Sequence, residues 1–291
     1  MSARVGYIAK RILDRGPTGI VLAAFDRSAY LEVDGSLVCL ADSGLDDGPL
    51  TVPCGDVAAL RSDMRYTPDI RGLTVWRPAA PKGWTLASLR NGYGAALHCA
   101  ARRAPRDGAA RCVFGSRPSN AETIAAQPAI GTLRDWLQRS FVGTPGRVPD
   151  DVCGLLGLGQ GLTPSGDDVL CGVMVAAHAL GRADIANALY AGLPLSKTNR
   201  ISAAHLAAAR EGAATAPLHR VLNAVLRGGA ETLSSQLAGL DRVGHSSGWD
   251  GFAGCIVALD AYRRASVRHP IHFQEDRAES RGSWIAKGDS K

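Results

Sequence analysis

The sequence is poor in several features that mark particular classes of protein. Aromatic residues make up 5% of the 291 residues, and only five of the 33 basic residues are lysines. The longest apolar run, 169–180, is too short to cross a bilayer, and residues 1–10 lack the apolar core of a signal peptide. At 46% hydrophobic and 21% charged residues, the chain is neither wholly disordered nor fibrous. We therefore expect a soluble, cytoplasmic protein of about two domains.

Metal-binding and nucleic-acid-binding patterns are also missing. The seven cysteines are scattered and odd in number, without a Cys-x-x-Cys pair or a Cys/His cluster at zinc-ligand spacing. The net charge of +6 is modest and the arginines are dispersed, which argues against a nucleic-acid partner. We expect no metal site, no organic cofactor, and no nucleic-acid or membrane partner.

Two kinds of pattern divide the chain near residue 80. Before it, short apolar runs are separated by turn-forming residues such as Asp34-Gly35, which predicts β-hairpins. After it, alanine- and leucine-rich stretches have helical spacing. We therefore predict an α+β fold, with a small antiparallel β-domain (a sheet or barrel) over 1–80 and a larger, mostly α-helical domain with a central apolar helix over 81–268. The polar residues 269–291 are expected to be a disordered tail.

The expected elements have the following ranges. Strands are predicted over Val5–Ala9, Gly19–Phe25, Ala29–Val33, Ser36–Leu40 and Leu73–Trp76. Helices are predicted over Thr85–Ala104, Ala121–Gln127, Ile130–Ser140, Ser165–Leu180, Ile185–Ala191, Ile201–Glu211, Pro217–Arg227, Ala230–Leu240 and Gly248–Arg264.

The most informative stretch is a glycine-rich loop that leads into the apolar helix. Glycines alternate at 157, 159 and 161, and Thr163-Pro164-Ser165-Gly166-Asp167-Asp168 follows. The lysine required at the P-loop position is missing, which excludes a P-loop, and the glycines do not have GxGxxG spacing, so the match to a dinucleotide-binding loop is poor. Ser165 and Asp168 have capping-box spacing, and they could do no more than cap the helix. Two adjacent carboxylates exceed what capping needs, and free N–H groups beside a glycine loop are typical of an anion site.

The pattern recurs 82 positions later. Ser165 to Gly172 aligns with Ser247 to Gly254, and both stretches read Ser-Gly-x-Asp-x-apolar-x-Gly. Two such helix starts could face one another and bind an anion jointly, with the later glycines allowing the helices to approach closely. Chance recurrence of a capping motif is an equally weighted alternative.

A basic segment, 196–202, lies between the two motifs. It contains Lys197, the sole lysine between Lys82 and Lys287, and Arg200, at the start of an alanine-rich helix. Cations are disfavoured at such a position unless an anion is bound there, which makes both residues candidate phosphate or carboxylate contacts. A solvated loop capped by Asn199 or Ser202 is the alternative. His245, beside the second motif, could reach the same cavity.

At these three motifs the sequence resembles the family of the H-type subunit of oxamate carbamoyltransferase, a bacterial family linked to allantoin breakdown. The resemblance rests on 157–168, 198–202 and 244–250 and extends over about 84–264. It implies a subunit of a complex that passes a carbamoyl group between phosphate and oxamate. The implied partner subunits include one of acyl-CoA-synthetase type. A non-catalytic subunit that binds a small carboxylate, or regulates a metabolic complex, is the alternative.

This interpretation gives each candidate residue a role. Helix N-termini and basic side chains would hold phosphate or carboxylate oxygens, and aspartates would accept from amide N–H groups, by positioning and charge stabilisation alone. We expect Asp167, Asp168 and Asp250 to be catalytic. We expect a small anionic substrate, carbamoyl phosphate or oxamate-like, to bind Gly159, Gly161, Thr163, Ser165, Gly166, Lys197, Thr198, Arg200, Ser202, His245, Ser246, Ser247 and Trp249.

Overall fold

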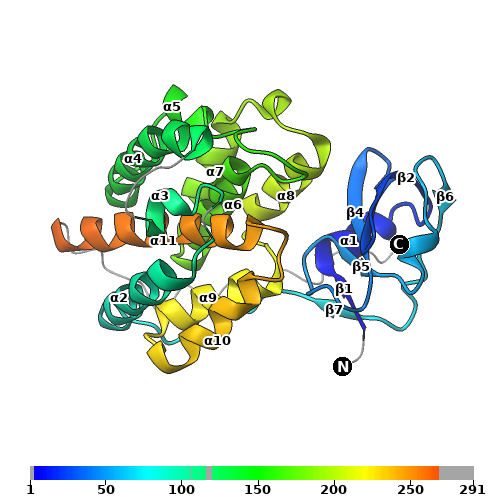
Figure 1. Cartoon of the computed structure of the whole chain (residues 1–291), viewed down its shortest axis with the longest axis horizontal. Coiled ribbons are helices and arrows are strands. Elements are labelled where there is room, and N and C mark those ends of the chain that lie inside the picture. The colour runs from blue at the N-terminus through cyan, green and yellow to red at the C-terminus, as the bar shows by residue number, and fades with distance from the viewer. Residues whose placement is uncertain (1–2, 106, 116–119, 269–291) are drawn as a thin grey trace, which may run out of the picture.

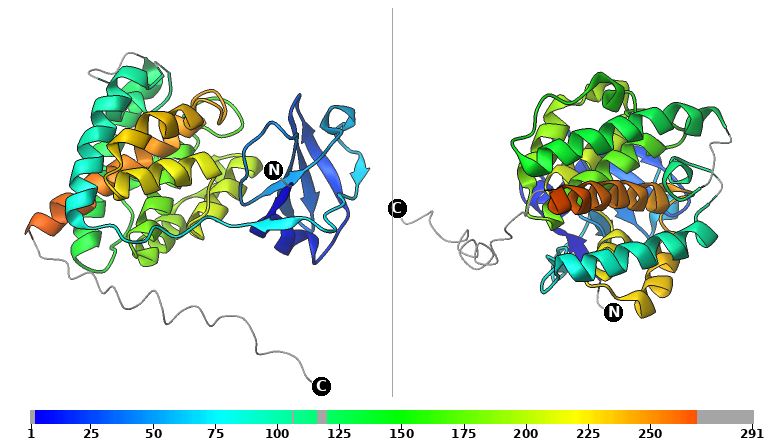
Figure 2. Two further views of the ribbon diagram at one scale, coloured as in Figure 1. Left: turned by 90° about the horizontal axis from the view of Figure 1, so that it is seen from below. Right: turned by 90° about the vertical axis from the view of Figure 1, so that its left-hand side faces the viewer.

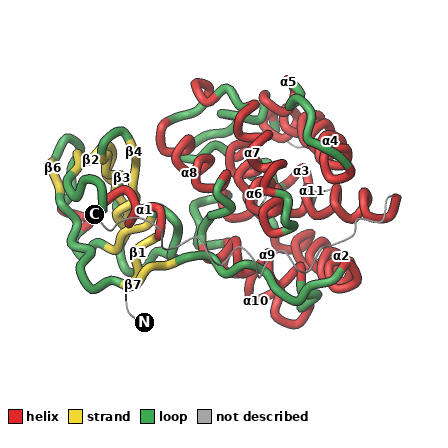
Figure 3. The backbone as a smooth tube through the Cα atoms, turned by 180° about the vertical axis from the view of Figure 1, so that it is seen from behind, coloured by secondary structure: helices red, strands yellow, loops and turns green. Residues whose placement is uncertain are grey.

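The computed structural model describes residues 3–105, 107–115 and 120–268. Strands gather at one end of this part of the chain and helices at the other (Figures 1 and 3). The predicted α+β class, with a small N-terminal sheet domain and a larger helical part, is confirmed. The tail expected over 269–291 lies outside the described residues.

The N-terminal part contains a five-stranded sheet and a separate two-stranded ribbon. The sheet has the order β5(Thr51–Pro53)-β4(Ser36–Ala41)-β3(Ser28–Val33)-β2(Gly19–Ala24)-β6(Arg65–Tyr66), and the ribbon pairs β1(Arg4–Gly6) with β7(Thr74–Trp76). Asp34 and Gly35 both have positive φ, at 47° and 76°, in the two-residue turn that joins β3 to β4. The hairpin predicted at Asp34-Gly35 is therefore confirmed.

Two details of this part differ from the sequence prediction. The five-stranded sheet is mixed, because β4 pairs with β5 in parallel beside three antiparallel pairings, and the separate ribbon of β1 and β7 is parallel too. The loop 42–50 carries the chain back to the starting end of β4 before β5 begins. The strand expected over Val5–Ala9 ends at Gly6, where helix α1(Tyr7–Leu13) begins. Ile8, Ala9 and Leu13 are buried at helical spacing, which becomes visible only when the residues after Ala9 are included.

The helical part is built around two long, adjacent helices. The central apolar helix predicted from the sequence is α6(Ser165–Ala179), and α11(Ser247–Arg268) packs along it. Helices α2(Leu86–Arg103) and α4(Ala121–Val142) lie on opposite sides of α11 (Figure 2). The remaining helices are α3(Arg111–Phe114), α5(Asp150–Cys153), α7(Ala183–Gly192), α8(Arg200–Arg210), α9(Ala216–Leu226) and α10(Ala230–Leu240), and short 3-10 turns span Val57–Ala59 and Leu195–Lys197.

One helix is longer than the sequence suggests. The two segments expected over Ala121–Gln127 and Ile130–Ser140 form the single helix α4, with Pro128 inside it. A proline only removes one donor and restricts the preceding residue, so a helix held by tertiary packing can continue through it. Ile130, Leu133 and Leu137, which follow Pro128, are all buried and supply that packing.

Helices α6 and α11 touch backbone to backbone. A Cβ atom added to Gly172 would overlap the carbonyl oxygen of Gly251, and one added to Gly254 would overlap that of Val169. The two contacts are related by the same 82-residue offset as the sequence motifs, because 169 and 172 correspond to 251 and 254. The repeated motif therefore forms a pseudo-two-fold helix pair whose closeness depends on glycine.

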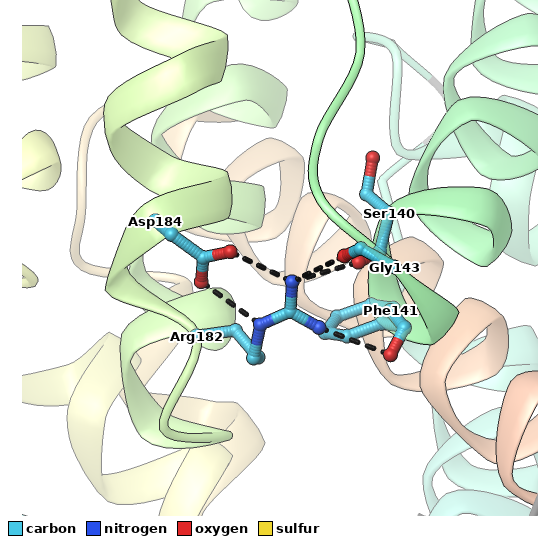
Figure 4. A network of polar contacts seen from close by, with 5 residues as sticks. All are labelled: Ser140, Phe141, Gly143, Arg182 and Asp184. Carbon is cyan, nitrogen blue, oxygen red and sulfur yellow. Dashed lines mark hydrogen bonds and ion pairs between the residues drawn. The ribbon is translucent and has the colours of Figure 1, made fainter.

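An arginine joins the end of α4 to the turn between α6 and α7. The Arg182 guanidinium donates to the carbonyl oxygens of Ser140, Phe141 and Gly143 at 2.8, 3.0 and 2.9 Å, and it also pairs with Asp184 (Figure 4). These are carbonyls at a helix end, which have no partner within the helix. Arg182 thereby fixes the far ends of α4 and α6 relative to each other.

Candidate functional site

A cavity of about 990 Å³ lies between the sheet domain and the helical part. The sheet domain contributes the stretch 25–28 and residues of β3 and β4, and the helical part contributes the starts of α4, α6 and α11. Thr163, Ser165 and Asp168 line it from the first motif, and Ser246 and Ser247 line it from the second. The starts of α6 and α11, which carry the repeated motif, therefore both line this cavity.

The two helix starts exchange hydrogen bonds in a crossed pattern. Ser247, the first residue of α11, hydrogen-bonds to Asp168 of α6, while Ser165, the first residue of α6, hydrogen-bonds to Asp250 of α11. The hydroxyl oxygens of Thr163 and Ser247 are 2.8 Å apart. Because 165 and 168 correspond to 247 and 250, each half of the repeat supplies one hydroxyl to the carboxyl group of the other half, and each carboxyl group also has a hydroxyl from its own half, Thr163 or Ser246.

Both carboxyl groups are held where ionisation is costly. Burial, and then the charge of Asp250, raise the pKa of Asp168 well above its ordinary value, although hydrogen bonds from Ser247 and Thr163 oppose the shift. Burial raises the pKa of Asp250 to about 6 against the hydrogen bond from the Ala110 amide, which donates to its Oδ1 at 2.7 Å. The Oδ2 atom of each aspartate is shielded from solvent and has no hydrogen-bond partner among the described residues.

The raised pKa of Asp250 makes the fold less stable as the pH rises. Between the unfolded pKa near 3.8 and the folded value of about 6, the folded state holds a proton that the unfolded state has lost, so the free energy of unfolding falls across this range. We expect Asp250→Asn to be more stable than the unmodified protein by roughly 3 kcal/mol at pH 7.5 and by little at pH 4. Urea unfolding at both pH values measures the difference, and equal effects at the two would contradict it.

Asp167 faces away from this cavity and anchors other segments. Its Oδ1 accepts from the Gly157 amide at 2.6 Å, and its Oδ2 accepts from the hydroxyls of Ser202, at 2.6 Å, and Thr198. Gly157 has a φ of 78° and lies against the carbonyl oxygen of Lys197. Asp167 thus joins the glycine-rich loop to the start of α8, and the catalytic role expected for it does not fit this position.

The capping box expected at the first motif does not form. The N-cap of α6 is Pro164, whose side chain cannot cap, and Ser165 is already helical. The amides of Asp167 and Asp168 donate to the Pro164 carbonyl, and the Gly166 amide donates to the Leu158 carbonyl at 2.9 Å. The chain's own carbonyls therefore occupy amides that were expected to bind an anion. At α8, by contrast, Asn199 caps the helix by accepting from the Ser202 amide at 3.0 Å.

The expected basic contacts do not line the cavity among the described residues. Arg200 pairs with Glu32 of β3, at 2.9 Å from Nη1 to Oε2, and more than half of its side chain is exposed. Lys197 lies in the 3-10 turn beside Gly157. The positive charge of Arg200 is neutralised by a carboxylate distant in the sequence, and the expectation that these two residues bind the substrate anion stays a prediction.

The other substrate-binding candidates differ in position. Gly161 and His245 line the cavity, and His245 Nε2 lies 3.6 Å from an Asp107 carboxylate oxygen. Gly159 packs against Ser165, and Gly166 packs against the carbonyl of Leu155. Trp249 is only 2% exposed, with its Nε1 donating to Asp241 at 2.9 Å. Its ring packs in the core beside Phe114 and Phe252, and the substrate contact expected from Trp249 stays a prediction.

Sequence reasoning missed several residues of the cavity wall. Glu122, in the first turn of α4, lines the cavity and has a buried Oε1 atom without a hydrogen-bond partner. Tyr30 of β3 and His205 of α8 also line it, with 3.1 Å between the Tyr30 hydroxyl and His205 Nε2. Burial lowers the pKa of His205 to about 4, so this histidine is neutral. An acid in a first helical turn is usually read as a dipole partner, and no sequence signal sets Glu122 apart.

Within the described ranges, no group of three histidine, cysteine, aspartate or glutamate residues is arranged to hold a metal ion. The same residues include no helix with the length and apolarity needed to span a bilayer.

Comparison with known proteins gives one match. Residues 155–259 match the family model described as oxamate carbamoyltransferase subunit AllH, and this confirms the resemblance seen in the motifs. The matched segment includes the starts of α6 and α11, which line the cavity. Neither the curated proteins nor the solved structures give a match to the chain. The family description supports a subunit of an oxamate carbamoyltransferase complex.

Proposed function

We propose that the cavity between the sheet domain and the helical part binds a small amide-bearing substrate of a carbamoyltransferase complex. The observation that carries the proposal is Asp168, which lines the cavity and has a shielded Oδ2 atom without a partner, beside the fully buried Asp250, whose Oδ2 also lacks a partner. A buried polar atom without a partner is costly unless a ligand satisfies it. Carbamoyl phosphate and oxamate each carry an amide and negative charge, so either could supply N–H donors.

The arrangement supports a division of tasks within the cavity. Asp168 would accept from the substrate amide, and the hydroxyls of Thr163 and Ser247, which hydrogen-bond to this carboxyl group, would hold it in position. Arg27 and Arg242 also line the cavity, and they would reach the anionic end of the substrate by sharing it with their present partners, Asp42 and Asp46. In this proposal the domains 1–80 and 81–268 both contribute to the binding site. Arg27 and Arg242 hold the anion, in place of Lys197 and Arg200.

The transfer step needs a proton acceptor but no covalent intermediate. The amide nitrogen of oxamate attacks the carbamoyl carbon of carbamoyl phosphate, a C–N bond forms, and the C–O bond to phosphate breaks with its electron pair leaving on phosphate. The nitrogen loses one proton. The hydroxyl of Ser165, which lines the cavity and hydrogen-bonds to the buried Asp250, could pass this proton to Asp250, since a pKa of about 6 leaves that carboxyl group mostly ionised at neutral pH. A role in allantoin catabolism and a cytoplasmic location accompany this proposal.

The test uses the complex assembled with its partner subunits. We expect Asp168→Asn to reduce phosphorolysis of oxalurate by at least about 100-fold, within the range typical for loss of a positioned catalytic or binding group. Asp150→Asn is the matched control, because the Asp150 side chain is 85% exposed on α5, and we expect unchanged turnover.

Two outcomes would count against the proposal. An unmodified, well-folded complex without activity would remove the carbamoyltransferase function. If Asp168→Asn abolishes oxamate binding by this chain in calorimetry but leaves turnover of the complex unchanged, the chain is instead a non-catalytic subunit that binds a small carboxylate.

A further inference from the structure

The cavity is much larger than the two substrates proposed for it. Its volume is about 990 Å³, at the upper end of the range of about 300–1,000 Å³ that is typical of pockets for drug-sized ligands. Oxamate and carbamoyl phosphate have only a few non-hydrogen atoms each, and the groups assigned to their amide, Asp168, Thr163 and Ser247, lie at or beside the starts of α6 and α11. A large part of the cavity is therefore left for another group.

The cavity wall next to Asp168 is apolar. Cys171 follows Asp168 by about one turn of α6 and lines the same cavity. A Cβ atom added to Gly251 would lie 3.3 Å from Leu218 Cδ2 and 3.7 Å from the Asp168 carbonyl oxygen, so Leu218 also lies beside this turn. We use the term apolar chamber for the part of the cavity that is lined by Tyr30, Cys39, Leu50, Cys171, Ala209 and Leu218.

The residues of the apolar chamber come from both domains and are connected by packing. The three from the helical part belong to one apolar core. In the sheet domain, Cys39 of β4 packs with Leu50 in one small apolar cluster and with Tyr30 in another. The Tyr30 hydroxyl lies 3.1 Å from Nε2 of His205, which precedes Ala209 by one turn of α8. The apolar chamber is therefore a continuous wall across the two domains.

The polar groups beside this wall already satisfy each other. Burial raises the pKa of the Tyr30 hydroxyl well above its ordinary value and lowers the pKa of His205 to about 4, so this hydrogen-bonded pair is neutral at pH 7.5. A charged group of a ligand would lose its hydration here without gaining a partner among these residues, whereas an apolar group would be stabilised by burial. The chemistry of the apolar chamber therefore favours an uncharged, apolar group.

We infer that the apolar chamber binds an uncharged apolar substituent on the amide nitrogen of the ligand. The inference rests on the proposed function for the position of the ligand amide at Asp168, one turn from Cys171. An amide with one nitrogen substituent keeps one N–H group to donate to Asp168, while the substituent enters the apolar chamber. The class of ligand is thereby extended from oxamate to N-alkyl carboxamides.

N-methyloxamate and N-butyloxamate test this inference, because they differ by three CH₂ groups and by no polar atom. Each buried CH₂ group contributes up to about fourfold in affinity. In calorimetry with the assembled complex at pH 7.5, we expect N-butyloxamate to bind at least tenfold more tightly than N-methyloxamate. The neutral pair N-butylacetamide and N-methylacetamide should show the same preference, since the apolar chamber does not contact the anionic end of the ligand.

Cys171→Met locates the preference in this chain. The longer side chain fills the apolar chamber, so the advantage of the butyl compounds should fall to within about threefold. Ala209→Val fills the same space from α8 and is the second variant, and circular dichroism confirms that each is folded. Cys99→Met is the matched control, because Cys99 is half-buried on α2, outside the described cavity wall, and the preference should be unchanged.

Equal affinities of the butyl and methyl compounds in both pairs would overturn the inference, and so would an unchanged preference in folded Cys171→Met and Ala209→Val. If the acetamide pair shows the preference while neither oxamate derivative binds, the apolar chamber stands and the oxamate-type substrate of the proposed function fails. Transferase activity of the unmodified complex without any preference for the butyl compounds is the converse result, in which the proposed function stands and the inference fails.

Discussion

Gly172→Ala is expected to destabilise the protein by more than about 3 kcal/mol, near or beyond the upper end of ordinary overpacking effects. The new methyl group would overlap the carbonyl oxygen of Gly251 in the neighbouring helix. That oxygen belongs to the backbone of α11, whose residues 248–262 are all buried, so it cannot shift without displacing other core residues. Gly254→Ala should have a similar effect, because it meets the Val169 carbonyl in the same way.

The control for this prediction is Gly131→Ala, also within a long helix. No atom lies within 4 Å of a Cβ added at Gly131, so the substitution should gain helix propensity and stabilise by about 0.5–1 kcal/mol. Urea denaturation at pH 7.5 measures all three variants. If Gly172→Ala and Gly131→Ala change stability in the same direction, the close contact between α6 and α11 is wrong.

Asp167→Ala is expected to cost about 3 kcal/mol or more, because it leaves three donors without their acceptor: the Gly157 amide and the hydroxyls of Thr198 and Ser202. A buried donor that loses its partner incurs the desolvation penalty in full. The damage should also be local. Hydrogen exchange should accelerate over 157–161 and 198–202, the two segments that Asp167 joins, before it accelerates in the core of α6.

Asp69→Ala is the comparison for this variant, since the Asp69 side chain is 63% exposed and pairs only with nearby Arg71. It should change stability by no more than about 0.5 kcal/mol. Uniform acceleration of exchange in Asp167→Ala, or none at all, would show that Asp167 does not hold the loop to α8.

The convergence of the two Ser-Gly-x-Asp motifs could be anticipated from sequence because repeated local patterns fold into repeated local structures. What could not be anticipated was how their polar groups pair. From the sequence, Arg200 is a candidate anion contact because its ion-pair partner cannot be predicted. That partner, Glu32, lies 168 residues earlier, in the sheet domain. Ser165 reads as a cap, yet its hydroxyl is directed to Asp250 on another helix.

Glu122 and Trp249 also show that the surroundings of a side chain cannot be predicted from the sequence alone. Glu122 looks like an ordinary acid at a helix start, and only the tertiary fold places its buried oxygen in the cavity wall. Trp249 looks exposed within a polar motif, but helical geometry points it to the core, away from Asp250. Secondary structure was predictable because it depends on neighbours in sequence, whereas side-chain partners depend on packing between distant segments.

The crossed hydroxyls have a consequence for how the protein acquires its binding site. Since α6 and α11 each supply a hydroxyl to the carboxyl group of the other, the full set of hydrogen bonds needs both helices, and α11 is the final helix of the described chain. During synthesis the site must therefore stay unformed until the ribosome has released residue 250 and its surroundings. Partial chains would expose the apolar flank of α6, which makes them ready targets for chaperones or proteases.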